Sequence, residues 1–237
     1  MSRLPILMYH NVCCDEKDSV KLTISNTKLE EQFKYFYKNN YTTLHFSELE
    51  NRKLIPKKSV IITFDDVTEN QFIYALPLLK KYNLKATFFI PFFYVGKTDL
   101  WDTGSKKIMT FSQLHDTYSD FVEFGYHSYK HQNYKQLSDE EITLDFEECK
   151  KTIQDNNLKV YPALAYPYGS FPRKKNEKEK FITNLVSNGM SFGLRIGNRP
   201  NKFPLKNKFE IQRIDVNGED SLIKFKYKLK FNHLLKL

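Results

Sequence analysis

The feature of this sequence that most restricts its fold is a short apolar segment that ends in two acidic residues. Residues 60–66 read VIITFDD, so a run with high β propensity leads directly to Asp65 and Asp66. Such a continuous apolar run is typical of a strand buried on both faces, as in a parallel sheet. Because chemistry collects at the carboxyl ends of parallel strands, the two acids are candidates for metal binding or acid–base catalysis. A solvated turn, in which Asp is common, is the alternative for this segment alone.

Segments with helical and with strand-like patterns alternate along the rest of the chain. Helices are predicted at residues 29–37, 47–52, 69–82, 110–117, 138–156 and 174–188, with a kink at Pro77. Strands are predicted at residues 4–9, 41–44, 60–64, 85–91, 121–124, 161–166, 191–195 and 209–216, whereas residues 222–235 fit either a helix or a strand. The alternation predicts an α/β fold, a mostly parallel sheet with outer helices that is either open or closed into a barrel. No repeat or linker divides the chain, so we expect a single domain over residues 1–237.

The composition supports a folded protein and limits the classes of partner. With 237 residues, of which 41% are hydrophobic, the chain can build a sizeable core, which excludes an intrinsically disordered protein. The net charge of +9 favours an anionic partner, but the lysines are scattered and an AT-rich genome would by itself raise the lysine content. We therefore expect no nucleic acid partner, although residues 224–230 could contact an anionic membrane peripherally. No feature of the sequence indicates an oligomeric state.

The cysteines and the N-terminal segment bear on the cellular location. Cys13, Cys14 and Cys149 form neither a disulfide framework nor a CxxC pair. Residues 1–12 lack the features of a cleavable signal peptide, and no run of about 18 apolar residues is present. These observations predict a reduced, cytoplasmic protein, or an exported one if a leader has been removed.

Two further motifs carry residues suited to chemistry. In residues 127–131, HSYKH, a helical turn would place His127 and His131 on one face as a clamp for a transition metal. A carboxylate from the end of the 60–66 segment would complete a His, His, Asp set with one position open for water. Structural histidines are the alternative. Residues 166–169, YPYG, form a tight turn that could direct a backbone N–H toward a cleft, although the motif alone is weak.

Taken in this order, the motifs resemble those of the polysaccharide deacetylase family, which is carbohydrate esterase family 4 and contains the NodB homology domain. The resemblance rests on residues 63–66 (TFDD), 127–131 (HSYKH) and 166–169 (YPYG), and it covers about residues 4–216. Residues 6–10, ILMYH, are similar to the branch that deacetylates poly-N-acetylglucosamine and related surface polymers. The resemblance implies a distorted (β/α) barrel of about seven parallel strands with outer helices.

The resemblance also implies a role for each matching residue. Asp66, His127 and His131 would bind a divalent metal ion, most often Zn²⁺, while Asp65 would be the general base and the backbone N–H of Tyr168 would stabilise the oxyanion. A bound cation would polarise the amide carbonyl and lower the pKa of water from about 15.7 towards 7.

Three departures from the family pattern affect these roles. Val67 replaces the glycine that usually follows the second Asp, so the turn must avoid a positive φ there or accept strain. Ala165 replaces the usual arginine partner of the base, and Arg213 or Arg195 could substitute for it. The Leu-x-x-His motif that supplies the general acid is missing. His10 is the best replacement, with a structural hydrogen-bonding role as its alternative.

Substrate-binding roles are expected for Tyr166, Trp101 and Arg213, although Trp101 could instead pack under its own loop. These assignments predict a metal-dependent hydrolase that removes N-acetyl or O-acetyl groups from an amino-sugar polysaccharide or its precursor. The expected substrate is an acetylated glycan or a lipid- or nucleotide-linked saccharide. Val67, Ala165 and the missing late histidine motivate a first rival, a carbohydrate-binding or scaffold module without turnover. The second rival is a deacylase of a non-sugar amide on the same barrel.

Overall fold

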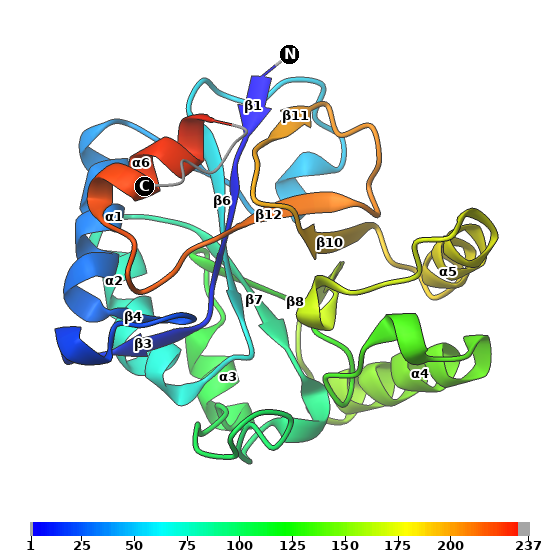
Figure 1. Ribbon diagram of the computed structural model, residues 1–237. Coiled ribbons are helices and arrows are strands. Elements are labelled where there is room, and N and C mark those ends of the chain that lie inside the picture. The colour runs from blue at the N-terminus through cyan, green and yellow to red at the C-terminus, as the bar shows by residue number, and fades with distance from the viewer. Residues whose placement is uncertain (1, 232–237) are drawn as a thin grey trace.

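The computed structural model describes residues 2–231 (Figure 1). Its centre is a ring of parallel strands in the order β2-β12-β10-β9-β8-β7-β6, closed by pairing of β6 with β2. The strands of the ring are β2 (Ile6–Tyr9), β6 (Ser59–Asp65), β7 (Ala86–Ile90), β8 (Val122–Tyr126), β9 (Val160–Ala165), β10 (Phe192–Ile196) and β12 (Ile211–Asp215). This confirms the barrel that the family resemblance implied. The strand and helix pattern alone had not distinguished an open sheet from a closed one, and the structure shows that the sheet is closed.

Smaller strands extend the ring at its edges. β5 (Thr42–Thr43) pairs with the first two residues of β6. β1 (Ser2–Leu4) pairs antiparallel with β11 (Asn201–Phe203), and β3 (Asn11–Cys13) pairs parallel with β4 (Thr23–Ser25). The strand predicted at residues 4–9 is thus divided at Pro5, which has no N–H to donate to a continuous ladder.

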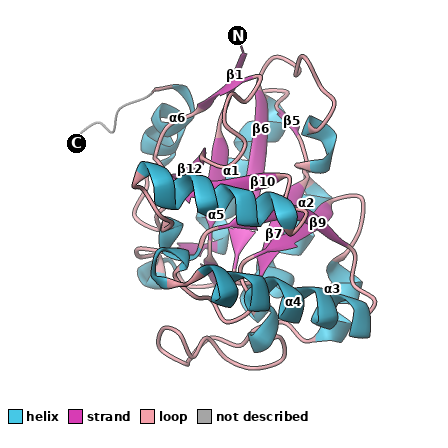
Figure 2. Ribbon diagram, turned by 90° about the vertical axis from the view of Figure 1, so that its right-hand side faces the viewer, coloured by secondary structure: helices cyan, strands magenta, loops and turns pink. Residues whose placement is uncertain are grey.

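Helices cover the outside of the barrel. They are α1 (Asn26–Lys38), α2 (Leu76–Lys81), α3 (Phe111–Thr117), α4 (Asp139–Asp155), α5 (Lys175–Ser187) and α6 (Leu222–Lys230). Figure 1 shows α1, α2 and α6 on one side, and Figure 2 shows α4 and α5 side by side on another. The capping boxes at Thr110 and Ser138 fix the starts of α3 and α4, in agreement with the helices predicted at residues 110–117 and 138–156. Among the described residues, no helix has the length and apolar character needed to cross a bilayer.

The short helical segments connect these elements, and one of them divides a predicted helix. They are η1 (Glu16–Asp18), η2 (Ser47–Leu49), η3 (Gln71–Ala75), η4 (Phe92–Tyr94), η5 (Tyr134–Gln136) and η6 (Pro167–Gly169). The helix predicted at residues 69–82 consists of the π-helical η3 followed by α2, because Pro77 lacks the N–H that a continuous α-helical ladder requires. Residues 222–235 were expected to form either a helix or a strand, and α6 shows that residues 222–230 are helical. Residues 232–235 lie outside the described residues.

Side chains of the barrel strands alternate between the interior and the outer layer of helices. In β6, Ile61 belongs to the interior cluster with Phe89 and Leu194, whereas Ile62 packs with helix residues such as Phe33. Because successive strand residues point to opposite faces, Asp65 lies on the interior face with Ile61. The alternation therefore directs the first acid of the apolar segment into the mouth of the barrel.

Candidate active site

The candidate site lies where the carboxyl ends of the barrel strands meet. By the alternation described above, residues two apart share the interior face, so Asp65 after Ile61, and His127 after Gly125, both point inward. Gly125 is required here because a Cβ at this position would lie 2.5 Å from the Phe89 ring. The inward direction of both side chains follows from strand geometry, and their proximity follows from closure of the barrel.

The turn after β6 places Asp66 beside these residues at the cost of backbone strain. Asp66 has φ 76° and Val67 has φ 45°, a region that residues with a Cβ rarely adopt and β-branched residues least of all. Val67 is fully buried in the outer core, and its carbonyl accepts a hydrogen bond of 2.9 Å from the N–H of Met109. Of the two alternatives that the sequence left for Val67, the structure shows the strained turn. Packing of its side chain stabilises the conformation that glycine would otherwise supply.

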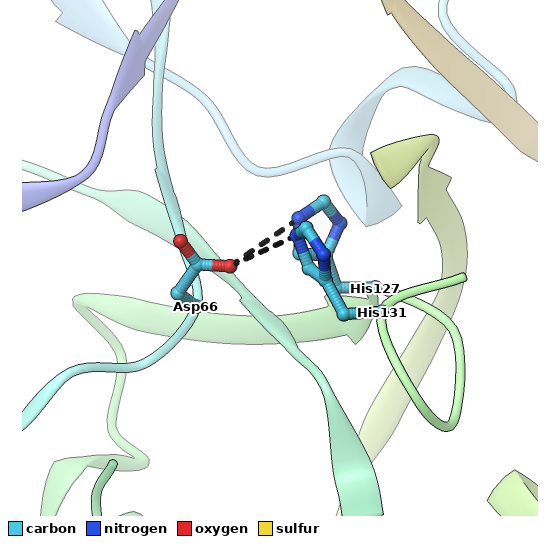
Figure 3. A group of neighbouring side chains, drawn as sticks. All are labelled: Asp66, His127 and His131. Atoms are coloured by element: carbon cyan, nitrogen blue, oxygen red, sulfur yellow. Dashed lines mark ion pairs between the residues drawn. The ribbon is translucent and has the colours of Figure 1, made fainter. Parts of the chain in front are cut away.

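Asp66, His127 and His131 converge as the sequence predicted, and their geometry suits a cation. Their ligand atoms lie within 4.8 Å of one another, and Figure 3 shows one Asp66 oxygen facing both imidazoles. Asp66 Oδ1 lies 3.5 Å from Nε2 of His127 and 3.5 Å from Nε2 of His131. Two ligands each about 2.1 Å from one tetrahedral ion would be roughly 3.4 Å apart. Within the described residues, the buried Oδ1 atom accepts no hydrogen bond, as expected of an atom reserved for a metal.

Both histidines direct Nε2 toward Asp66, but the segment that carries them is not helical. Nδ1 of His127 lies 2.8 Å from the carbonyl oxygen of Ala165; donation to that oxygen leaves Nε2 free as a ligand. Residues 127–131 form an irregular loop in which Ser128 has φ 60° and His131 has φ 53°. The helical turn predicted for this motif is therefore wrong. The loop is held instead by Asp145 of α4, whose carboxylate accepts the Tyr129 N–H at 2.7 Å.

The electrostatics of this group also suit the binding of a cation. Burial and the neighbouring Asp65 carboxylate raise the pKa of Asp66 well above its usual value. Burial lowers the pKa of His127 to about 4 and also lowers that of His131, so both imidazoles are neutral, as metal ligands must be. A bound cation would favour the ionised form of Asp66 and stabilise this otherwise uncompensated carboxylate.

Asp65 has the opposite environment because it is paired with a buried arginine. Arg213 of β12 binds it with both terminal nitrogens, Nη1 at 2.5 Å from Oδ1 and Nη2 at 2.7 Å from Oδ2. Burial opposes ionisation of Asp65, but Arg213 and the nearby imidazoles hold its pKa well below the usual range. Arg213 is therefore the cationic partner of Asp65, which the sequence had left open between Arg213 and Arg195. Arg195 is not, since its guanidinium bonds to the carbonyl of Ile196.

His10 lies beside Asp65 at the end of β2. Its Nε2 atom is 3.7 Å from Asp65 Oδ2, and its side chain is 13% exposed. Burial lowers the pKa of His10, while the charges of Asp65 and Asp215 act in the opposite direction. His10 is thus a close neighbour of the candidate base Asp65. Asp215, at the end of β12, was not among the sequence-based candidates.

Tyr168 and Trp101 lie beside the candidate metal group. Tyr168 has φ 60° and ψ 10°, a rare conformation for a residue with a Cβ, and its ring contacts His131 edge-on at 4.8 Å. Trp101 stacks on His131 with 4.5 Å between ring centroids and 19° between ring planes. The rings of both residues therefore flank the imidazole of His131.

Two proposed substrate contacts do not fit the structure. Tyr166 is fully buried among aromatic side chains, and its hydroxyl donates to the carbonyl of Phe209 at 3.0 Å. Arg213 is only 1% exposed, and two of its guanidinium nitrogens bind Asp65. We correct both assignments: Tyr166 is a packing residue, and Arg213 positions a carboxylate inside the barrel.

Comparisons with known proteins agree with this geometry. The family model for polysaccharide deacetylase matches residues 53–184, more than half of the chain. The protein YxkH of Bacillus subtilis is 28% identical over 174 residues, which are 72% of this chain, and the chain spans 58% of the length of YxkH. The poly-β-1,6-N-acetyl-D-glucosamine N-deacetylase of Staphylococcus epidermidis is 25% identical over 234 residues, covering 93% of this chain and 78% of that protein.

The fold has a close counterpart among solved structures. The deacetylase PplD of Streptococcus pyogenes, solved in complex with acetate, superimposes with a TM-score of 0.80 over 97% of this chain and 99% of that one, at 23% identity. This likeness supports the barrel, while the motifs and the matched family model support the assignment. The chain therefore belongs to the polysaccharide deacetylase family, so the deacetylase class of hydrolase expected from its motifs is confirmed at the level of the family.

Proposed function

We propose that the protein is a metal-dependent deacetylase that removes N-acetyl groups from an amino sugar in a surface glycan or its precursor. The observation that carries this proposal is the meeting of two different carboxylate sites at one barrel mouth: the Asp66, His127, His131 group and the Asp65–Arg213 pair. The Staphylococcus epidermidis relative makes poly-β-1,6-N-acetyl-D-glucosamine the first polymer to test. O-acetyl groups on the same class of glycan are the nearest alternative.

The ligand set favours Zn²⁺ as the metal. Two imidazoles and one carboxylate are characteristic of catalytic zinc sites, which keep a position open for water or substrate. A divalent cation at this group supplies Lewis acidity toward the acetyl carbonyl and makes bound water more acidic. Trp101 and Tyr168 border His131 and would hold the sugar ring at this position.

Asp65 is the proposed general base. Its carboxylate stays ionised over the whole working pH range because Arg213 binds both of its oxygens. The same ion pair makes Asp65 a weak base, so it can only take a proton from an acidic donor. Arg213 also fixes the direction of the carboxylate, which lies 3.8 Å from Nε2 of the metal ligand His127.

Tyr168 and His10 complete the proposed chemistry. The backbone N–H of Tyr168 would donate to the developing oxyanion, an interaction whose loss typically costs about 3–4 kcal/mol of barrier. His10 would hand a proton to the leaving amine, since it is the imidazole next to Asp65 that is not a proposed metal ligand. We expect His10→Ala to lower kcat about 100-fold or more. An unchanged rate would return His10 to a structural role.

The test of this function is acetate release from a panel of acetylated saccharides, with and without added divalent ions. Poly-N-acetylglucosamine oligomers, lipid- or nucleotide-linked saccharides and O-acetylated glycans form the panel, and a non-sugar acetamide serves as the rival substrate. We expect acetate only from saccharides and only with metal present. Metal analysis of Asp66→Ala and His131→Ala should show loss of a stoichiometric ion. A metal-free wild-type protein that binds glycan without turnover would support the scaffold alternative. Cytoplasmic location and peripheral membrane contact stay predictions.

A further inference from the structure

The candidate acid His10 and the candidate base Asp65 follow the point at which the pairing of β2 with β6 ends. β2 and β6 pair in register up to the pair Tyr9–Phe64. One residue further, His10 leads into β3, which pairs with β4 and not with the ring. On the other strand, Asp65 leads into the strained turn at Asp66. The backbone ladder therefore stops before the two residues whose side chains lie 3.7 Å apart.

The side-chain amide of Gln71 connects the two segments immediately beyond this point. Nε2 of Gln71 donates to the carbonyl oxygen of His10 at 2.9 Å and to that of Asp65 at 2.6 Å. Gln71 is completely buried. Its amide can have only this orientation, because the reversed amide would place Oε1 against two carbonyl oxygens. Among the described residues, Oε1 accepts no hydrogen bond, so the two donations determine the position of the side chain.

The backbone around Gln71 is arranged to deliver this amide. Gln71 begins the π-helical segment η3, and its own N–H donates to the carbonyl of Thr68 at 2.9 Å. The preceding residue, Asn70, accepts the N–H of Val12 at 2.8 Å and so attaches the same segment to β3. π-Helical turns are rare and are frequently found at functional sites. This turn ties the segment after β6 to the segment after β2.

We propose that Gln71 is a positioning residue that sets the spacing of His10 and Asp65 by replacing the next rung of the β2–β6 ladder. This inference rests on the proposed function of those two residues. The amide satisfies two buried carbonyl groups that would otherwise lack partners. Because a displacement of about 1 Å at a reacting group can lower a rate about 100-fold, loss of the bridge should act on kcat more than on KM.

The first test variant is Gln71→Met, which keeps the length of the side chain and removes both donors. The matched control is Gln32→Met. Gln32 is also buried, and it accepts a hydrogen bond of 2.6 Å from Tyr9, but it makes no hydrogen bond to the carbonyl of His10 or of Asp65. We expect kcat of Gln71→Met to fall at least 10-fold with KM changed less than about threefold, while Gln32→Met keeps wild-type kcat despite a similar fall in melting temperature.

A second variant, Gln71→Glu, gives a readout that a purely structural role would not produce. An ionised glutamate would repel both carbonyls, whereas its protonated form can donate to one of them. The activity of Gln71→Glu relative to wild type should therefore rise as the pH falls, and that of Gln71→Met should not. This variant also carries the test if Gln71→Met does not fold.

The outcomes separate this inference from the proposed function. A folded Gln71→Met with wild-type kcat, or a Gln71→Glu whose relative activity is independent of pH, would overturn the positioning role. If the wild-type protein releases no acetate from any saccharide, the proposed function fails, and a crystal structure of Gln71→Met still tests the spacing. We expect the distance between His10 Nε2 and Asp65 Oδ2 to exceed its 3.7 Å by about 0.5 Å or more. An unchanged distance would refute the bridge.

Discussion

Asp65 and Asp66 are adjacent in the sequence, equally acidic as free side chains and both buried, yet they occupy opposite environments. Arg213 binds both oxygens of Asp65 and keeps its pKa low. Asp66 faces two neutral imidazoles, and burial raises the pKa of its carboxyl group. The first carboxylate carries its own counter-charge within the fold, whereas the second is complementary to a cation from outside. This difference fits the separate tasks proposed for them, proton transfer for Asp65 and metal binding for Asp66.

The largest expected effect separates the two tasks directly. Asp65→Asn should keep the metal, because the Asp66, His127, His131 group is untouched, and should lower the deacetylation rate about 10²–10⁴-fold through loss of the base. Metal content and acetate release are measured on the same preparation. Near-wild-type acetate release from Asp65→Asn would show that the base lies elsewhere.

The second prediction concerns the counter-charge of Asp65. Arg213→Met should lower the free energy of unfolding by about 3–5 kcal/mol at pH 7, because it leaves a buried carboxylate without a partner. The pKa of Asp65 is depressed in the wild type, so the ion pair stabilises the fold above the unfolded pKa and loses this effect as the pH falls. The deficit of Arg213→Met in denaturant unfolding should therefore shrink below about pH 4. The double variant Asp65→Asn/Arg213→Met should recover part of the lost free energy of unfolding. If the loss in the double variant equals the sum of the losses in the two single variants, the pairing is contradicted.

Asp145 provides a third buried carboxylate for the same comparison, this time with neutral partners only. Tyr134 donates to it at 2.6 Å, but burial dominates and raises its pKa from 3.8 to about 6. The native state then holds its proton more tightly than the unfolded state, so stability should fall by roughly 3 kcal/mol as the pH rises from about 4 to 6. Asp145→Asn should abolish this part of the pH dependence. Parallel stability curves for the two proteins between pH 4 and 7 would count against it.

The smallest effect is expected at the turn that places Asp66. Val67→Gly should change the free energy of unfolding by less than about 1 kcal/mol, because relief of the positive φ offsets the loss of a buried side chain. As a control, Val122→Gly in β8 removes a buried valine from an ordinary strand and should cost clearly more. Equal losses at the two positions, measured by denaturant unfolding, would mean that Val67 is not strained.

The two carboxylate regions also differ in how far they could be predicted. The candidate metal group of Asp66, His127 and His131 could be predicted from motifs, because metal ligands must be specific residue types. The partner of Asp65 was only guessed, since Arg213 lies 148 residues away and competed with Arg195. Gln71 and Asp145 gave no signal at all. Each lies within a predicted helix, and their function depends on acceptors or donors supplied by distant segments.

The sequence by itself determined the alternation of strands and helices through local periodicity and the residues of the candidate metal group through chemically specific motifs, whereas the barrel was implied by the family resemblance of those motifs. Only the tertiary structure decided that a loop brings the two histidines together, that Val67 accepts strain, that Arg213 replaces the missing arginine, and that Tyr166 is buried. The physical reason is that these features depend on barrel closure. Closure sets which side chains meet across the ring, and no local pattern in a single chain encodes those distances.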